Sequence, residues 1–193
     1  MFGGVALLLF AAQAGLSEIE QRKIDALGAS GASIRVQVDD RGSPEVWVDF
    51  NKKISDPALR PLRNFAQVTT LRILNGDISD AGLDHLVGVD RLWLLVIKSD
   101  RLTDGAALRV SKIKSIRKLD FMGAQLSKRG LGAIAKMAAL EQLYLHGARL
   151  SEGATKSLRG MTRLRDLTVP KSLPATEFTE LKRALPKVRI ERF

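Results

Sequence analysis

The hydrophobic and polar positions of this chain repeat with a constant 24-residue period. A nine-residue phrase begins with Ile or Leu, continues with Ser or Thr and ends on an apolar residue. A fixed period of this length indicates that each copy is one structural unit and that successive units stack on each other. The five copies are ISDPALRPL (54–62), ISDAGLDHL (78–86), LTDGAALRV (102–110), LSKRGLGAI (126–134) and LSEGATKSL (150–158).

Each unit has two halves, in which the apolar residues are spaced differently. Before the phrase, apolar residues alternate with other residues, which predicts a short strand with one buried face. Within the phrase the apolar spacing is helical, as at Ile78, Leu83 and Leu86. A unit of one strand and one helix cannot bury its own apolar face, so stacked units must share a continuous core. The strand leucines that recur at this period are Leu71, Leu95, Leu119, Leu143 and Leu167.

A Ser or Thr stands at every junction between the two halves. These residue types cap helices by accepting a hydrogen bond from a backbone N–H, so each junction predicts a helix start. Asp follows the Ser or Thr in three units, where a negative charge suits a helix N-terminus. The junction residues are Ser55, Ser79, Thr103, Ser127 and Ser151, and the acids are Asp56, Asp80 and Asp104.

The repeat resembles the leucine-rich repeat family, in its short bacterial form with units such as LxLxxTxVTDAGLxxL. The resemblance covers residues 46–193, as about six units with the last one truncated. It implies an α/β fold: a right-handed, arc-shaped solenoid with a parallel sheet on the concave face and helices on the convex face. The usual Asn or Cys after the strand is missing, so its backbone groups need other partners. Gly76, Asp100, Ala124 and Ala148 stand in its place.

The residues before the repeats predict an N-terminal cap over 15–45. Residues 16–30 form an amphipathic pattern with Ile19, Ile24 and Leu27 on one face. Residues 32–40 and 44–50 alternate like strands around a Gly-Ser-Pro turn signal. We expect a helix followed by a hairpin, and the second hairpin strand starts the parallel sheet. Residues 188–193 would form the last strand.

Residues 1–14 resemble a secretory signal peptide. They hold an uncharged apolar run followed by the small-residue pattern Ala12-Gln13-Ala14. No Lys or Arg precedes the run, and the alternative is a helix that caps the domain. If the signal is genuine, the protein is exported to the periplasm, cell envelope or medium, and otherwise it is cytoplasmic. The run is too short to span a membrane, so we expect no membrane span in the mature protein.

The chain holds little that points to catalysis or to a cofactor. It has no cysteine, which excludes disulfides and thiolate metal sites. His85 and His146 fall in unrelated positions of the repeat, so they predict no metal site. A Gly-rich phosphate loop and a Gly-x-Ser-x-Gly nucleophile motif are both missing. The sequence therefore predicts a protein that is not an enzyme and has no cofactor and no metal.

The strand residues that point away from the core predict a binding surface on the concave sheet. Several are apolar or aromatic where a solvated face needs neither, which is typical of a contact surface. The alternative is a shifted strand that buries Leu94 and Val96, because the segment WLLVI is apolar on both faces. The predicted partner-binding residues are Arg72, Trp93, Val96, Lys118, Asp120, Met122, Tyr144 and His146.

Charge is distributed unevenly along the chain. Residues 1–100 hold 11 Lys+Arg and 13 Asp+Glu, whereas residues 101–193 hold 20 and 8. A basic cluster can bind phosphate, sulfate or an acidic polymer, although it can equally be a solvated surface. Nucleic-acid recognition usually adds stacking aromatic residues or an element that enters a groove, and neither is evident. The predicted anion-binding residues are Arg109, Lys112, Lys114, Arg117 and Lys118.

Three functions are open from the sequence. The first is a non-enzymatic module that binds a protein partner through the concave sheet. The second is an electrostatic binder of anionic polymers or surfaces through the basic C-terminal half. The third follows only from the family resemblance, in which some members are substrate-recognition arms of ubiquitin-ligase-like assemblies. The sequence does not identify the partner.

Overall fold

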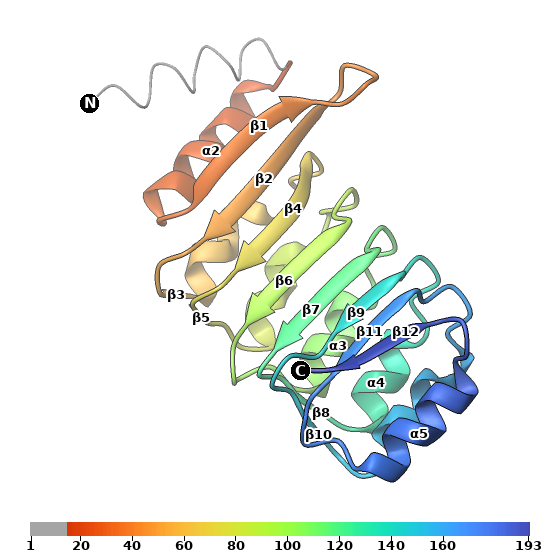
Figure 1. Ribbon diagram of the computed structural model, residues 1–193. Helices are drawn as coiled ribbons and strands as arrows, with labels where there is room; N and C mark the ends of the chain where they lie inside the picture. Colours follow the sequence, from red (N-terminus) through yellow and green to blue (C-terminus); the bar gives the residue numbers. More distant parts are fainter. Residues whose placement is uncertain (1–14) are drawn as a thin grey trace.

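The computed structural model describes residues 15–193 of the chain (Figure 1). The signal peptide predicted for residues 1–14 lies outside the described residues. No helix within residues 15–193 is long and apolar enough to cross a membrane.

One long sheet runs the length of the molecule and confirms the predicted α/β architecture. Its strands lie in the order β1-β2-β4-β6-β7-β9-β11-β12. The first pair is antiparallel and forms the predicted hairpin, and every later pair is parallel. The strands are β1 (Ser33–Val38), β2 (Pro44–Phe50), β4 (Val68–Ile73), β6 (Leu94–Lys98), β7 (Lys118–Met122), β9 (Gln142–Tyr144), β11 (Asp166–Val169) and β12 (Arg189–Arg192).

Short helices cover one face of this sheet, and the other face is open (Figure 1). Three of the five repeat helices are 3₁₀ rather than α-helices, and all five are only six or seven residues long. In η1, Pro57 and Pro61 also lack the N–H groups that an α-helix uses. The helices are α2 (Glu18–Ala29), η1 (Asp56–Leu62), η2 (Ala81–Leu86), α3 (Asp104–Val110), α4 (Lys128–Ile134), η3 (Ala154–Gly160) and α5 (Ala175–Ala184).

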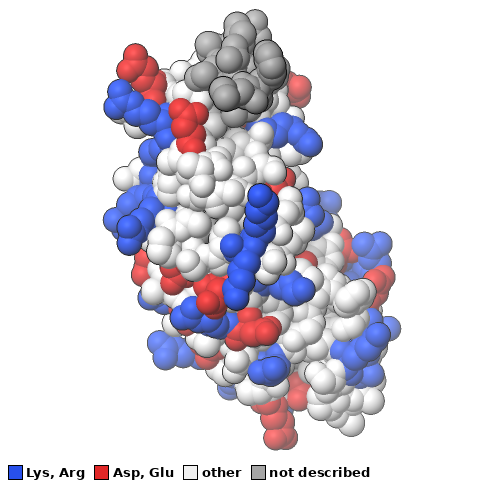
Figure 2. Space-filling view, turned by 90° about the vertical axis from the view of Figure 1, so that its left-hand side faces the viewer, with Lys and Arg blue, Asp and Glu red and all other residues white. Residues whose placement is uncertain are grey.

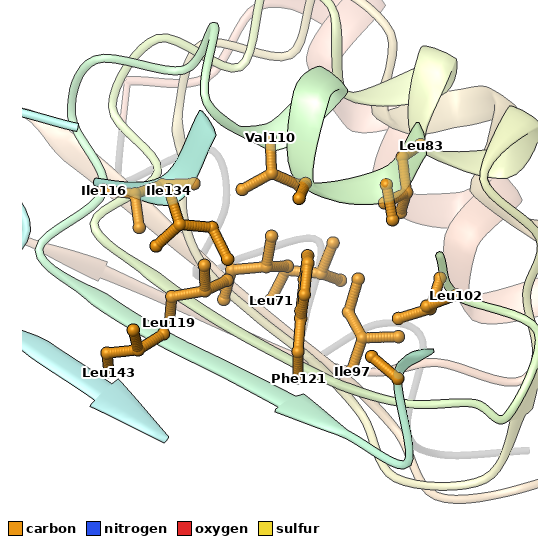
Figure 3. Close-up of a cluster of buried hydrophobic side chains, with 14 of the residues drawn as sticks. Leu71, Leu83, Ile97, Leu102, Val110, Ile116, Leu119, Phe121, Ile134 and Leu143 are labelled. Atoms are coloured by element: carbon orange, nitrogen blue, oxygen red, sulfur yellow. The ribbon is translucent and has the colours of Figure 1, made fainter. Parts of the chain in front are cut away.

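The core lies between the sheet and the helices. The five strand leucines pair side by side in register and are buried, as the 24-residue spacing predicts. Figure 3 shows Leu119 and Phe121 of β7 pointing toward Val110 of α3 and Ile134 of α4. Burying apolar surface at about 25 cal/mol per Å² is the main favourable contribution to a solenoid of this kind.

The sequence predicted that the junction Ser and Thr residues cap the helices that follow them, and two of the five do so. Thr103 and Ser127 accept hydrogen bonds from the backbone N–H groups of Gly105 and Arg129, so they cap α3 and α4 as predicted. Ser55 makes no capping hydrogen bond. Ser79 and Ser151 are not the residues that precede η2 and η3, and neither of those helices has a side-chain cap.

The three junction acids join neighbouring repeats to each other. The carboxylate of Asp56 accepts hydrogen bonds from the backbone N–H (2.8 Å) and hydroxyl (2.6 Å) of Ser79 in the next repeat. Asp80 binds Thr103 in the same way, and Asp104 binds Ser127. The favourable position of these acids at a helix start is therefore only part of their role, because they also bind the next repeat. We call each of these three pairs an Asp bracket.

Glycines make room for the Asp brackets. A Cβ atom built on Gly82 would overlap the carboxylate of Asp56, and one on Gly130 would overlap that of Asp104. Neither glycine has a positive φ, so close approach rather than backbone conformation accounts for them.

Backbone pairing between neighbouring coils replaces the missing Asn after each strand. Two short parallel pairs form beyond the main sheet, β3 (Ile54–Ser55) with β5 (Gly76–Asp77) and β8 (Gln125–Leu126) with β10 (Arg149–Leu150). In the repeat between them, the hydroxyl of Ser99 donates to the carbonyl of Ile78 at 2.7 Å. The turn backbone is thus satisfied by its neighbours.

The N-terminal cap extends the helix layer over the hairpin. Helix α2 begins with a capping box between Ser17 and Glu20 and packs against η1. Ile24 and Leu27 are fully buried, as predicted. Ile19 was predicted on the same face, but it is 67% exposed because the buried stripe of this helix is narrow.

Candidate functional site

The open face of the sheet contains a hollow of about 630 Å³. Its lining comes from six neighbouring strands and the residues beside them. All eight predicted partner-binding residues line it. We call this the sheet hollow, and its lining is Arg35, Trp47, Asp49, Thr70, Arg72, Leu74, Trp93, Leu94, Val96, Lys118, Asp120, Met122, Tyr144 and His146.

The strand register explains why these residues meet. Arg72, Val96, Asp120 and Tyr144 pair across β4, β6, β7 and β9, so they form one row across the sheet. Neighbouring parallel strands lie about 4.8 Å apart, which keeps side chains in such a row in contact. In this row the apolar side chain of Val96 lies between the charged side chains of Arg72 and Asp120.

Strand β6 has the register that the concave-surface prediction requires. Leu95 and Ile97 are fully buried, whereas Leu94 and Val96 are half-buried and line the sheet hollow. The alternative of a shifted strand is therefore wrong. Both faces of β6 are apolar because one contacts the core and the other forms the floor of the hollow.

Trp93 immediately precedes β6 and is 39% exposed. Its N–H donates to the carbonyl of Thr69, and its own carbonyl accepts from both Arg117 and Lys118. Trp93 lies outside the strand, so the alternation of β6 does not determine the direction of its side chain. Trp93 and Leu94 can therefore both line the hollow although they are neighbours in sequence.

Sequence reasoning missed the part of the hollow that the hairpin contributes. The Arg35 guanidinium lies 5.2 Å from the ring centre of Trp47, and Asp49 lies 3.6 Å from Arg72. The indole Nε1 of Trp47 is buried and has no hydrogen-bond partner among the described residues. The alternation PEVWVDF held the signal, because burial of Val46 and Val48 puts Trp47 and Asp49 on the opposite face.

An aromatic cluster closes the other end of the hollow. The rings of Tyr144 and His146 stack with centroids 5.7 Å apart, and Phe193 meets His146 edge-on at 4.7 Å. Nδ1 of His146 lies 3.1 Å from each carboxylate oxygen of Asp120. The Lys118 ammonium lies 5.2 Å from the ring centre of Tyr144. These contacts hold Tyr144 in a fixed orientation at the edge of the hollow.

Burial raises the pKa of two groups here. It raises the pKa of the Tyr144 hydroxyl, and the charge of Asp166 adds to the effect, so this hydroxyl stays a neutral donor. Burial also raises the pKa of Asp120 above its ordinary 3.8, although the hydrogen bond and charge of His146 and the charge of Lys118 act in the opposite direction.

We predict that replacing Asp120 by Asn becomes more favourable to stability as the pH rises. The raised pKa means that the folded state binds this proton more tightly than the unfolded chain does. Wild-type stability from this group is therefore present below its ordinary pKa of 3.8 and is lost as the pH rises through the folded-state pKa. Urea denaturation at acidic and at neutral pH measures the difference in free energy of unfolding between the two proteins.

The two proteins are compared with His146 replaced by Gln in both, so that no imidazole titrates beside Asp120. The single variant His146→Gln is therefore measured against the double variant His146→Gln/Asp120→Asn. A difference between the two that stays constant with pH, or that moves in favour of the protein with Asp120, would contradict the prediction.

The predicted anion-binding residues do not form one cluster. Arg109 and Lys112 line a small hollow beside η2, where Arg109 donates to Asp84 at 2.8 Å. Lys114, Arg117 and Lys118 line a different hollow of about 810 Å³ at the amino ends of β6 and β7. We call the second one the rim hollow, and its lining is Asp90, Arg91, Trp93, Lys114, Ser115, Arg117, Lys118, Ala139, Glu141 and Gln142.

Ion pairs neutralise part of the basic charge of residues 101–193. Arg101, Arg159 and Arg189 each pair with an acid of the described chain, at distances between 2.5 and 3.1 Å. On the face where the parallel strands end, Lys and Arg side chains alternate with Asp and Glu rather than form one continuous patch (Figure 2). The excess of cations in residues 101–193 is thus distributed over several small surfaces.

The two histidines lie on different elements of the structure. His146 lines the sheet hollow, whereas His85 belongs to η2 and lines neither hollow. Residues 15–193 contain no group of three or more His, Cys, Asp or Glu placed to hold a metal ion. The chemistry that the sheet hollow offers is apolar contact, stacking and hydrogen bonding by charged groups.

The leucine-rich repeat fold agrees with the family resemblance of the sequence. The sequence matches no protein-family model and no curated protein. A similar solved structure is an internalin (inlF) from Listeria monocytogenes str. 4b F2365, at 15% sequence identity and a TM-score of 0.44. The similarity covers 68% of this chain and 43% of the internalin chain. The repeats and the sheet, rather than this similarity, carry the assignment of the fold.

Proposed function

We propose that this protein is a non-enzymatic binding module that holds a protein partner on the open face of its sheet. Proteins with leucine-rich repeat folds commonly bind other proteins and are typically not catalysts. The observation that carries the proposal is the sheet hollow itself, which gathers Trp47, Trp93 and Tyr144 with exposed cations and an apolar floor.

The chemistry of the hollow suits a protein surface. Trp and Tyr are frequent binding hot spots, because they bury a large apolar area and keep one polar group for a hydrogen bond. Trp93 is exposed and Tyr144 is half-buried, so both have surface left to bury. Arg35 and Arg72 lie at the hairpin end and Lys118 lies near Tyr144, where charge can orient the partner.

We predict that the double variant Trp93→Ala/Tyr144→Ala loses the partner. Each truncation removes a hot-spot aromatic at a cost of about 2 kcal/mol, so together they weaken binding by about 1,000-fold. Immobilised wild type and variant are exposed to extract of the native cells, and every recovered protein is quantified by mass spectrometry.

A matched control removes exposed apolar side chains elsewhere. Ile19 is 67% and Val87 is 54% exposed, and neither lines the sheet hollow. Ile19→Ala/Val87→Ala should recover the same proteins as wild type, and circular dichroism should show all three proteins folded. Equal recovery of every protein by wild type and Trp93→Ala/Tyr144→Ala would overturn the proposal.

A further inference from the structure

The sheet hollow and the rim hollow share part of their walls. Trp93 and Lys118 line both, one immediately before β6 and the other at the start of β7. The two hollows are therefore adjacent, with Trp93 and Lys118 between them, and we call them together the groove. A chain that lies in this groove contacts both surfaces in succession.

The two parts of the groove have different chemistry. The sheet hollow beside Trp93 has an apolar floor that includes Leu94, Val96 and Met122. The rim hollow is lined by the exposed side chains of Lys114 and Arg117. An occupant with an apolar side chain at one end and a polar one at the other matches both hollows.

Three of the four cations of the rim hollow form no ion pair with an acid of residues 15–193. None of the ion pairs among residues 15–193 includes Lys114, Arg117 or Lys118. Arg91 differs, because it is bound to Asp39 and to the carbonyl of Pro44. The unpaired cations are thus complementary to an anionic group on an occupant.

A uniformly charged polymer fits this groove poorly. Asp49 and Asp120 line the sheet hollow, and Asp90 and Glu141 line the rim hollow. A continuous row of phosphates or sulfates meets all four of these carboxylates, whereas a peptide with separate acidic side chains can contact Lys114 and Arg117 alone. A peptide matches the groove better, because apolar and acidic side chains can alternate along one chain.

We propose that the groove binds an extended, acidic peptide segment of the partner, with an apolar anchor residue in the sheet hollow and Asp or Glu residues in the rim hollow. The inference rests on the proposed function and specifies its partner. Trp93 immediately precedes β6 and Lys118 begins β7, and these adjacent strands lie about 4.8 Å apart. An extended peptide advances about 3.3 Å per residue, so the acids lie within about three residues of the anchor.

A random peptide library displayed on phage tests the proposal on the full chain. Peptides enriched by wild type should carry Trp, Phe or Leu with Asp or Glu within three residues. Lys114→Gln/Arg117→Gln should retain the apolar preference and lose the acidic one. Lys52→Gln/Lys53→Gln is the matched control, since it removes the same charge at exposed positions outside both hollows, and it should enrich acidic peptides like wild type.

The best enriched peptide and its Glu→Gln or Asp→Asn copy then give affinities by fluorescence anisotropy. The copy should bind wild type about fivefold more weakly and Lys114→Gln/Arg117→Gln with nearly the affinity of the original. The inference is overturned if the two peptides bind wild type with equal affinity, or if no peptide is enriched. It is also overturned if single-stranded oligothymidylate displaces the peptide at a lower concentration than the unlabelled peptide does.

The experiment separates this inference from the proposed function. If enrichment disappears with Trp93→Ala/Tyr144→Ala but acids make no difference, the binding face stands and the acidic segment is wrong. If enrichment is the same for wild type and Trp93→Ala/Tyr144→Ala, the binding face itself is wrong.

Discussion

Replacing Phe121 by Ala should lower the free energy of unfolding by about 3–5 kcal/mol. The side chain is fully buried in the central strand β7, and it points toward helices α3 and α4 (Figure 3). Its removal costs the transfer free energy of the ring and leaves a cavity that the close-packed neighbours fill only partly. Because each repeat contacts only its neighbours, a cavity in the central repeat weakens the contacts to both sides.

Urea denaturation followed by circular dichroism measures this loss. Val87→Ala is the matched control, because Val87 is 54% exposed and its truncation should change the free energy by no more than about 0.5 kcal/mol. A loss below about 1 kcal/mol for Phe121→Ala, well under the range for a buried aromatic, would mean that β7 does not hold the core together.

Replacing Asp104 by Ala should lower the free energy of unfolding by about 2 kcal/mol, although its side chain lies outside the apolar core. The change leaves the backbone N–H and the hydroxyl of Ser127 without their acceptor. Hydrogen bonds to a charged group contribute about 1.5–3 kcal/mol, and partial exposure of this site to water reduces the combined effect of the two bonds. Asp104→Asn retains one acceptor oxygen and should cost about half as much.

The same denaturation experiment distinguishes the Asp bracket from a general effect of charge. Asp90→Ala removes an exposed acid that belongs to no ion pair of the described chain, and it should change stability by about 0.5 kcal/mol at most. Gly130→Ala should resemble Asp104→Ala, because the added Cβ displaces the same carboxylate. Equal effects of Asp90→Ala and Asp104→Ala would refute the role of the bracket.

The candidate site followed from the sequence only as far as the repeat extends. The template identified the outward positions of the repeat strands, so Trp93, Val96 and Tyr144 were found. It did not identify Arg35, which precedes the repeats, or Trp47. Trp47 stands 24 residues before Leu71 and so falls on a buried position of the template, but Val48 is the residue that pairs with Leu71. The basic segment 109–118 was treated as one cluster because its residues are neighbours in sequence. The chain direction changes between α3 and β7, and this turn places its cations in two hollows.

The sequence by itself determined the fold of this protein, because a 24-residue apolar period permits only stacked units that share one core. It also placed the buried leucines and two of the helix caps, which depend on local spacing. Tertiary structure alone decided what the junction acids bind, since Asp104 reaches Ser127 only when neighbouring coils stack. It likewise decided which side chains meet across strands, so the groove at Trp93 and Lys118 exists only in the folded sheet.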